Sequence, residues 1–157
     1  MRLQGGGRRA DVVGLLARLI LGGVLIVAGA LKVTSPAASA LSVRAFQILP
    51  YEVAGYLGYM LPTVEMAVGL LLLVGLFTRA SAVVGGLLML AFLVGIISAW
   101  ARGLNIDCGC FGGGGTVEAS QTRYLTDIVR DAGLAACAAW LVVRPGTAYS
   151  FDRRLFG

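Results

Sequence analysis

The stretch "ASAVVGGLLMLAFLVGIISAW", residues 80–100, contains no charged side chain. A helix rises about 1.5 Å per residue, so about 20 apolar residues cross the roughly 30 Å hydrocarbon core of a bilayer. The stretch therefore predicts a transmembrane helix. It is followed directly by the polar sequence "ARGLNIDCGC", residues 101–110, where the chain leaves the bilayer.

The composition of the whole chain agrees with a membrane protein. Of its 157 residues, 58% are hydrophobic and 13% are charged, and the mean hydropathy is +0.86. Soluble domains contain about 25% charged residues, and their polar surface dilutes the apolar ones. A soluble fold of this length has too little interior to bury so much apolar area, which leaves the lipid bilayer as the solvent.

Three further apolar runs accompany residues 80–100, namely 12–33, 55–77 and 124–143. The last is the least apolar, because Asp127, Arg130 and Asp131 lie near its start. We therefore expect an all-α, polytopic membrane protein whose residues 12–143 form a bundle of four transmembrane helices.

Basic residues indicate the orientation, because cytoplasmic segments of membrane proteins carry an excess of Lys and Arg. Residues 1–11, the turn after residue 77 and residues 144–157 together contain seven arginines, against five basic residues in the other two loops. We expect both terminal tails to be cytoplasmic, the loop 101–123 to be extracytoplasmic, and the protein to lie in a bacterial plasma (inner) membrane. An alternative is that Arg8, Arg9 and the "AGA" at 28–30 mark a cleaved signal peptide. The length of the run and Arg18 within it favour a retained helix.

Several functions are excluded by the residue types. The chain contains no histidine, which removes Ser-His and Cys-His catalytic pairs and histidine-ligated metals. Its basic residues form no stripe interleaved with aromatic ones, so the net charge of +5 does not indicate nucleic-acid binding. No nucleic-acid partner and no metal site are expected.

Two charged residues fall within the predicted helices, Arg18 in the first and Glu65 in the second. Unpaired charge inside a membrane is unfavourable, so such residues usually pair. We expect a structural ion pair between Arg18 and Glu65, with a proton relay or a quinone contact at Glu65 as the alternative. Pro62, one turn before Glu65, is expected to leave a backbone carbonyl without its helical partner.

Cys108 and Cys110 are the main candidates for chemistry. A disulfide across one residue closes a strained ring, and strained, exposed disulfides are the labile ones. Two thiolates are too few for a closed zinc site, and so short a ring restrains an unfolded chain too little for a structural staple. Redox exchange is therefore favoured. Arg130 and Asp131, close by in the sequence, are candidates to tune the thiols or to form an ordinary pair at the lipid headgroups.

The chain also resembles a known family. The segments "ARLILGGVLIVAGALKV" (17–33), "LPTVEMAVGLLLLVGLFTRASA" (61–82), "FLVGIISAWARGLNIDCGCFG" (92–112) and "VRDAGL" (129–134) are similar to successive segments of the DoxX-like membrane proteins, closest to the MauE branch. The resemblance implies a four-helix membrane protein linked to extracytoplasmic thiol-disulfide chemistry. Related arrangements pass electrons from thiols to a quinone but use two cysteine pairs, whereas this sequence offers one.

Together these features predict a thiol-disulfide oxidoreductase or accessory redox subunit. It would exchange electrons through Cys108 and Cys110 with a thioredoxin-like extracytoplasmic partner, using a quinone as candidate cofactor or passing electrons to another membrane subunit. Cys110, next to the glycines, is expected to face the partner, and Cys108 to resolve, because the charge of Asp107 should raise its pKa. The alternative is a non-catalytic structural or assembly subunit of a respiratory or cell-envelope membrane complex.

Overall fold

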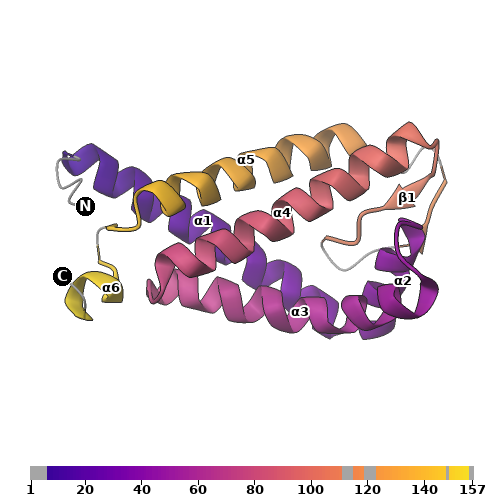
Figure 1. Ribbon diagram of the computed structural model, residues 1–157, viewed down its shortest axis with the longest axis horizontal. Coiled ribbons are helices and arrows are strands. Elements are labelled where there is room, and N and C mark those ends of the chain that lie inside the picture. The colour runs from indigo at the N-terminus through magenta and orange to yellow at the C-terminus, as the bar shows by residue number, and fades with distance from the viewer. Residues whose placement is uncertain (1–6, 111–114, 119–122, 148, 156–157) are drawn as a thin grey trace.

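A computed structural model of the protein describes residues 7–110, 115–118, 123–147 and 149–155, and shows an elongated helical bundle (Figure 1). Four long helices run along the bundle axis, each antiparallel to the one before it. The chain begins and ends at one end of the bundle, and the cysteine loop lies at the other, which we call the thiol end. The long helices are α1 (Arg8–Val33), α3 (Tyr51–Val74), α4 (Thr78–Ala101) and α5 (Tyr124–Val143).

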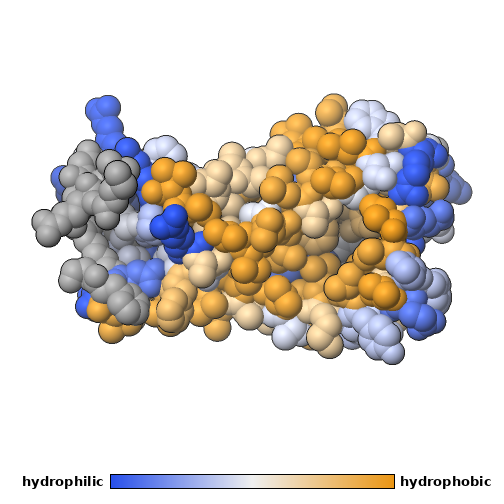
Figure 2. Space-filling view, viewed as in Figure 1, coloured by the Kyte–Doolittle hydropathy of each residue, from blue (hydrophilic) through white to orange (hydrophobic). Residues whose placement is uncertain are grey.

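Among the described residues, three helices are long and apolar enough to cross a membrane, namely α1, α3 and α4. The fourth, α5, has Asp127, Arg130 and Asp131 within its first two turns and is not one of the three. Apolar side chains cover the middle of the bundle, and polar ones gather toward its two ends (Figure 2). This belt of exposed apolar residues, which includes Leu87 and Val94 on α4, is the surface that lipid tails cover.

Small residues let the first two long helices approach closely. A Cβ atom at Gly22 of α1 would lie 3.0 Å from the Gly69 carbonyl oxygen of α3, and one at Gly69 would lie 2.8 Å from the Gly22 oxygen. Close backbone contact of this kind is how membrane helices gain packing energy without a hydrophobic driving force. Leu21, Leu25 and Leu72 fill the core beside this crossing.

The short helix α2 (Pro36–Ala45) was not predicted from the sequence. It packs against α3 at the position where Pro62 lacks an N–H, so the Gly58 carbonyl four residues earlier has no helical donor. The Ser39 hydroxyl of α2 donates to that carbonyl at 2.7 Å. A side chain at Gly58 would overlap the backbone of Ala40. The carbonyl that the proline was expected to free is therefore satisfied by α2.

The thiol end is closed by a two-residue β-ladder, also absent from the sequence prediction. Strand β1 (Ile106–Asp107) pairs antiparallel with β2 (Gly115–Thr116). Tyr124, the first residue of α5, fixes the ladder, because its hydroxyl accepts from the Ile106 N–H at 3.0 Å and donates to the Leu104 carbonyl. The segment that carries both cysteines is thereby attached to α5.

At the opposite end, the segment after α5 folds back over the turn between α3 and α4 and continues into α6 (Phe151–Leu155). The Asp152 carboxylate accepts from the backbone N–H groups of Phe77 and Thr78 at 2.8 and 2.7 Å, which caps the start of α4. The Arg18 guanidinium donates to the Thr147 hydroxyl at 2.8 Å. Arg18 is thus held by this C-terminal segment, and the predicted pair with Glu65 is wrong.

Candidate functional site

Cys108 and Cys110 lie in the turn that follows β1. Gly109 between them has φ of 66°, in the left-handed region that glycine adopts without strain. This conformation lets the Cys110 backbone N–H point back to the Cys108 sulfur, 3.4 Å away. The Asp107 carboxylate accepts from the Gly109 N–H at 2.9 Å and stabilises the same turn. The glycine therefore determines how the two thiols face each other.

Both thiols are free and buried, with residue exposures of 7% for Cys108 and 6% for Cys110. They pack in a cluster at the thiol end with Phe46, Ile96 and Tyr124. The third cysteine, Cys137, packs at the edge of the main core and takes no part in this cluster. The two thiols that the sequence singled out are thus adjacent, and both are covered by protein.

Arg130 brings a positive charge to the thiols. Its Nη2 lies 3.9 Å from the Cys108 sulfur. Two carboxylates hold the guanidinium in place: Asp131 accepts from Nε at 3.0 Å, and Asp127 lies 3.1 Å from Nη1. Asp127, Arg130 and Asp131 all lie near the start of α5, and Asp127 and Arg130 are three residues apart, a spacing that makes helix side chains neighbours. The start of α5 therefore holds the Arg130 guanidinium in a fixed position beside the loop. Of the two candidates from the sequence, Arg130 contacts Cys108 and Asp131 contacts Arg130. Asp127 was not among the predicted site residues.

The two thiols differ in acidity. A hydrogen bond from Cys110 lowers the pKa of the Cys108 thiol, with further help from the Cys110 backbone N–H and from Arg130. The same hydrogen bond and burial raise the pKa of the Cys110 thiol. The sequence argument that Asp107 raises the pKa of Cys108 is wrong, since the direction is the opposite. The pair therefore loses its first proton at Cys108.

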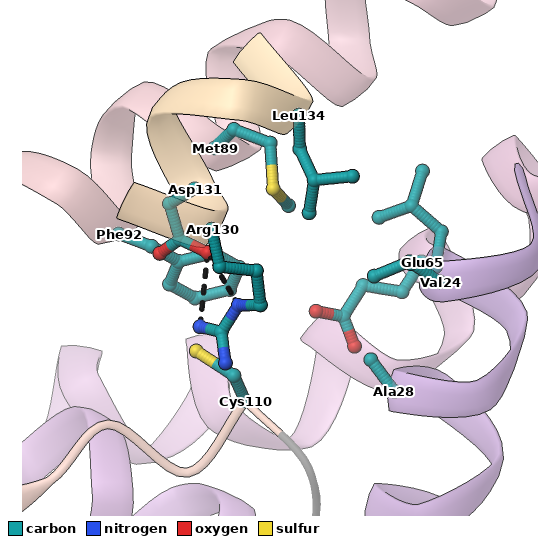
Figure 3. A pocket seen from close by; sticks show the side chains of 10 residues that line it. Val24, Ala28, Glu65, Met89, Phe92, Cys110, Arg130, Asp131 and Leu134 are labelled. Atoms are coloured by element: carbon teal, nitrogen blue, oxygen red, sulfur yellow. Dashed lines mark hydrogen bonds and ion pairs between the residues drawn. The ribbon is translucent and has the colours of Figure 1, made fainter. Parts of the chain in front are cut away.

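Below the thiols, a small cavity opens between the loop and the bundle core (Figure 3). Cys110, Arg130 and Asp131 line one side of it, and Glu65 lies across from them. Its volume is about 10 Å³, which is room for about one water molecule. Binding sites for small molecules usually enclose about 300–1,000 Å³, so this cavity by itself is far too small for a ligand the size of a quinone ring. No group of three metal-ligating side chains occurs among the described residues.

The partner of Glu65 is Lys32, the last basic residue of α1. The Lys32 ammonium lies 2.6 Å from one carboxylate oxygen of Glu65 and donates to the other at 2.9 Å. It also lies 5.2 Å from the centre of the Phe92 ring. An interior position for Lys32 was not predicted, because a lysine near the end of an apolar run is typically an interfacial cation. The chain folds so that this cation turns inward.

A bundle with three membrane-crossing helices and an apolar belt defines the chain as a multi-pass membrane protein, here with a buried thiol pair at one end. The model of the family described as "Methylamine utilisation protein MauE" matches residues 10–144. The chain belongs to the MauE family. No curated protein and no solved structure matches it.

Proposed function

We propose that this protein is a membrane thiol-disulfide redox protein that exchanges electrons with an extracytoplasmic partner through Cys108 and Cys110. The observation that carries the proposal is the position of Arg130 Nη2, 3.9 Å from the Cys108 sulfur, with Cys110 as a second hydrogen-bonding neighbour. A thiolate beside a cation is the reactive form of cysteine, whereas cysteines that serve only packing lie in apolar surroundings.

The exchange begins with Cys108 as the thiolate and Cys110 as the thiol. The Cys108 sulfur attacks a disulfide of the partner, forms a mixed disulfide and releases one partner sulfur as a thiolate. Cys110 then gives its proton to that thiolate and attacks the Cys108 sulfur. This closes the Cys108–Cys110 disulfide and releases the partner's second thiolate. Two electrons pass to the partner, and the reverse sequence oxidises a partner dithiol.

The two cysteines take roles opposite to those expected from the sequence. The lower pKa and the contact with Arg130 make Cys108 the sulfur that joins the partner. Cys110 lines the inner cavity and keeps its proton longer, which suits the resolving role. Cys108 and Cys110 are only 7% and 6% exposed, so the exchange requires the loop to move away from Tyr124 before a partner can reach either sulfur.

The membrane arrangement that serves this chemistry is a four-helix bundle with α5 as the fourth crossing. The charges of α5 lie in its first two turns, beside the thiols, and the rest of the helix is apolar. We infer that the plasma membrane surrounds the bundle, with both termini cytoplasmic and the thiol end extracytoplasmic. This orientation matches the arginine distribution and puts the thiols in the compartment where disulfides persist.

The partner is inferred to be a thioredoxin-like protein of a methylamine-utilisation system, the process that the family description names. The thiol-disulfide steps themselves need no quinone, and the cavity beside Cys110 is too small for one while the loop stays closed. A second membrane subunit with its own dithiol or disulfide completes the cycle. The likeness to the wider DoxX-like group, seen in the sequence, is compatible with such an accessory role.

Trapping of the mixed disulfide tests the proposal. In membranes that contain the partner, Cys110→Ser should accumulate a covalent adduct that reductant releases on a non-reducing gel, because the resolving thiol is missing. Cys108→Ser is the matched control and should give no adduct. The opposite pattern would exchange the two roles. If neither single variant forms an adduct, and the double variant with both Cys108→Ser and Cys110→Ser supports normal disulfide formation, the protein is instead a structural subunit.

A further inference from the structure

A second cavity lies on the surface of α3, away from the thiols. Its volume is about 190 Å³, and it is lined by Arg44, Glu52, Gly55, Tyr56 and Tyr59. Four of the five lining residues belong to the first three turns of α3, and Arg44 comes from the last turn of α2. Figure 1 places both segments at the thiol end of the bundle. The cavity thus lies where the apolar belt gives way to polar surface.

The cation at this cavity, Arg44, is held in place by several contacts. Arg44 donates from Nε to the Tyr51 carbonyl at 3.1 Å and from Nη1 to the Tyr51 hydroxyl at 3.2 Å. Its guanidinium carbon lies 3.8 Å from the centre of the Tyr51 ring. Any side chain at Gly55 would overlap the guanidinium. These contacts fix the orientation of a planar cation, the geometry that suits recognition of a phosphate.

The other residues that line the cavity offer an anion and two aromatic rings. Glu52 is exposed, and within the part of the chain that the structure describes it forms no ion pair. Tyr56 is 71% exposed and Tyr59 is 49% exposed, so their rings are open to a ligand. Carboxylates and the faces of aromatic rings both attract ammonium groups. A ligand that suits the cavity therefore carries a phosphate and an ammonium group a few atoms apart.

We propose that this cavity binds the headgroup of a zwitterionic phospholipid, with its phosphate at Arg44 and its ammonium at Glu52, Tyr56 and Tyr59. The surroundings agree with a lipid, because tyrosines gather at the level of the headgroups in membrane proteins. From the cavity, α3 continues toward the membrane centre with exposed Met60 and Val64, which offer apolar contact to the acyl chains. An anionic headgroup without an ammonium leaves Glu52 uncompensated and is disfavoured.

Native mass spectrometry of the full-length protein in detergent micelles tests this site. One palmitoyl-oleoyl phospholipid at a time is added in an amount equimolar to the protein. Phosphatidylethanolamine should be retained more than phosphatidylglycerol. Each of Glu52→Gln and Arg44→Gln should lower the retention of phosphatidylethanolamine about fivefold, the effect of one partly exposed charge contact. The matched controls are Glu118→Gln and Arg123→Gln, which remove exposed charges at the same end outside the cavity. They should retain the lipid as the parent protein does.

Equal retention of phosphatidylethanolamine and phosphatidylglycerol would overturn the proposal. The proposal would also be overturned if no cavity variant lowered the retention of phosphatidylethanolamine. The same holds if the two control variants lowered it as much as the cavity variants do. Because Arg44 also contacts Tyr51, circular dichroism checks that the Arg44→Gln variant is folded. Tyr56→Leu, which leaves these contacts intact, serves as a second cavity variant. Phosphatidylcholine retained as strongly as phosphatidylethanolamine supports a zwitterionic site that relies on the aromatic rings.

Discussion

The Lys32 ammonium lies 2.6 Å from the Glu65 carboxylate, and the two residues are only 3% and 1% exposed. Removing one partner of a buried pair leaves an uncompensated charge, which typically destabilises a protein by about 3–5 kcal/mol. Glu65→Gln should therefore lower the melting temperature in detergent, as measured by circular dichroism. Lys32→Met combined with Glu65→Leu removes both charges and should recover most of the loss. A single variant as stable as the parent would contradict a structural role for this pair.

The pH dependence of thiol alkylation should report the effect of Arg130 on Cys108. Because the pKa of Cys108 is lowered, its reaction with iodoacetamide should reach half its maximal rate below the ordinary value of about 8.5. Arg130→Gln removes a stabilising cation, so the midpoint should move to higher pH and the rate at pH 7 should fall severalfold. Arg130→Lys keeps the charge and should fall less. Peptide mass spectrometry after timed quenching measures Cys108 separately, and an unshifted midpoint in Arg130→Gln would argue against the contact.

Tyr124→Phe should expose the thiols. The change removes one hydroxyl that bonds to Ile106 and Leu104 and leaves the ring in its place among its neighbours. With its attachment to α5 weakened, the loop should open more often, and maleimide should label Cys108 and Cys110 severalfold faster. Labelling of Cys137, in another part of the core, serves as the control within the same molecule. A uniform increase at all three cysteines would indicate general loosening instead.

Ser39→Ala tests whether α2 satisfies the carbonyl freed by Pro62. Loss of the 2.7 Å hydrogen bond leaves the Gly58 oxygen buried without a donor, which should destabilise the protein by about 1–3 kcal/mol. Ser39→Ala with Pro62→Ala restores the helical N–H donor to the same oxygen and should recover stability. The comparison is a thermal melt of the two variants and the parent. If the double variant is no more stable than Ser39→Ala, the proline does not explain the contact.

The inferred topology can be tested on intact cells. After mild reduction, a membrane-impermeant maleimide should label Cys108 or Cys110 from outside and leave Cys137 unlabelled, since Cys137 packs at the bundle core. Labelling that requires lysis of the cells would place the thiol end in the cytoplasm.

The sequence predicted the long helices well because each apolar run has the length of a membrane crossing. The structure has a helix across all four predicted segments, and α5 coincides with residues 124–143. The boundaries of α1 and α3 differ, since residues such as Arg8 and Tyr51 continue a helix beyond the apolar run that hydropathy detects. Helix α2 was missed because its ten residues are too few and too mixed for a crossing, although Pro36 after Ser35 is a common start of a helix.

The candidate site was predictable in part. Cys108, Cys110, Arg130 and Asp131 were recognised by residue type and nearness in the sequence, and the structure brings them together. The partner of Glu65 was not predictable, because depth along a helix does not specify which side of it faces a neighbour. Arg18 and Lys32 both point inward, and the fold of the C-terminal segment decides that Arg18 contacts Thr147.

The contacts of Asp152 with Phe77 and Thr78 lie at the opposite end of the bundle from the thiols. The long helices lie side by side and span the distance between the two ends. A reporter or affinity domain joined to either terminus therefore leaves the thiol end unobstructed. The same separation lets the end that carries both termini diverge in sequence, or acquire attached domains, without altering the geometry of the thiol pair.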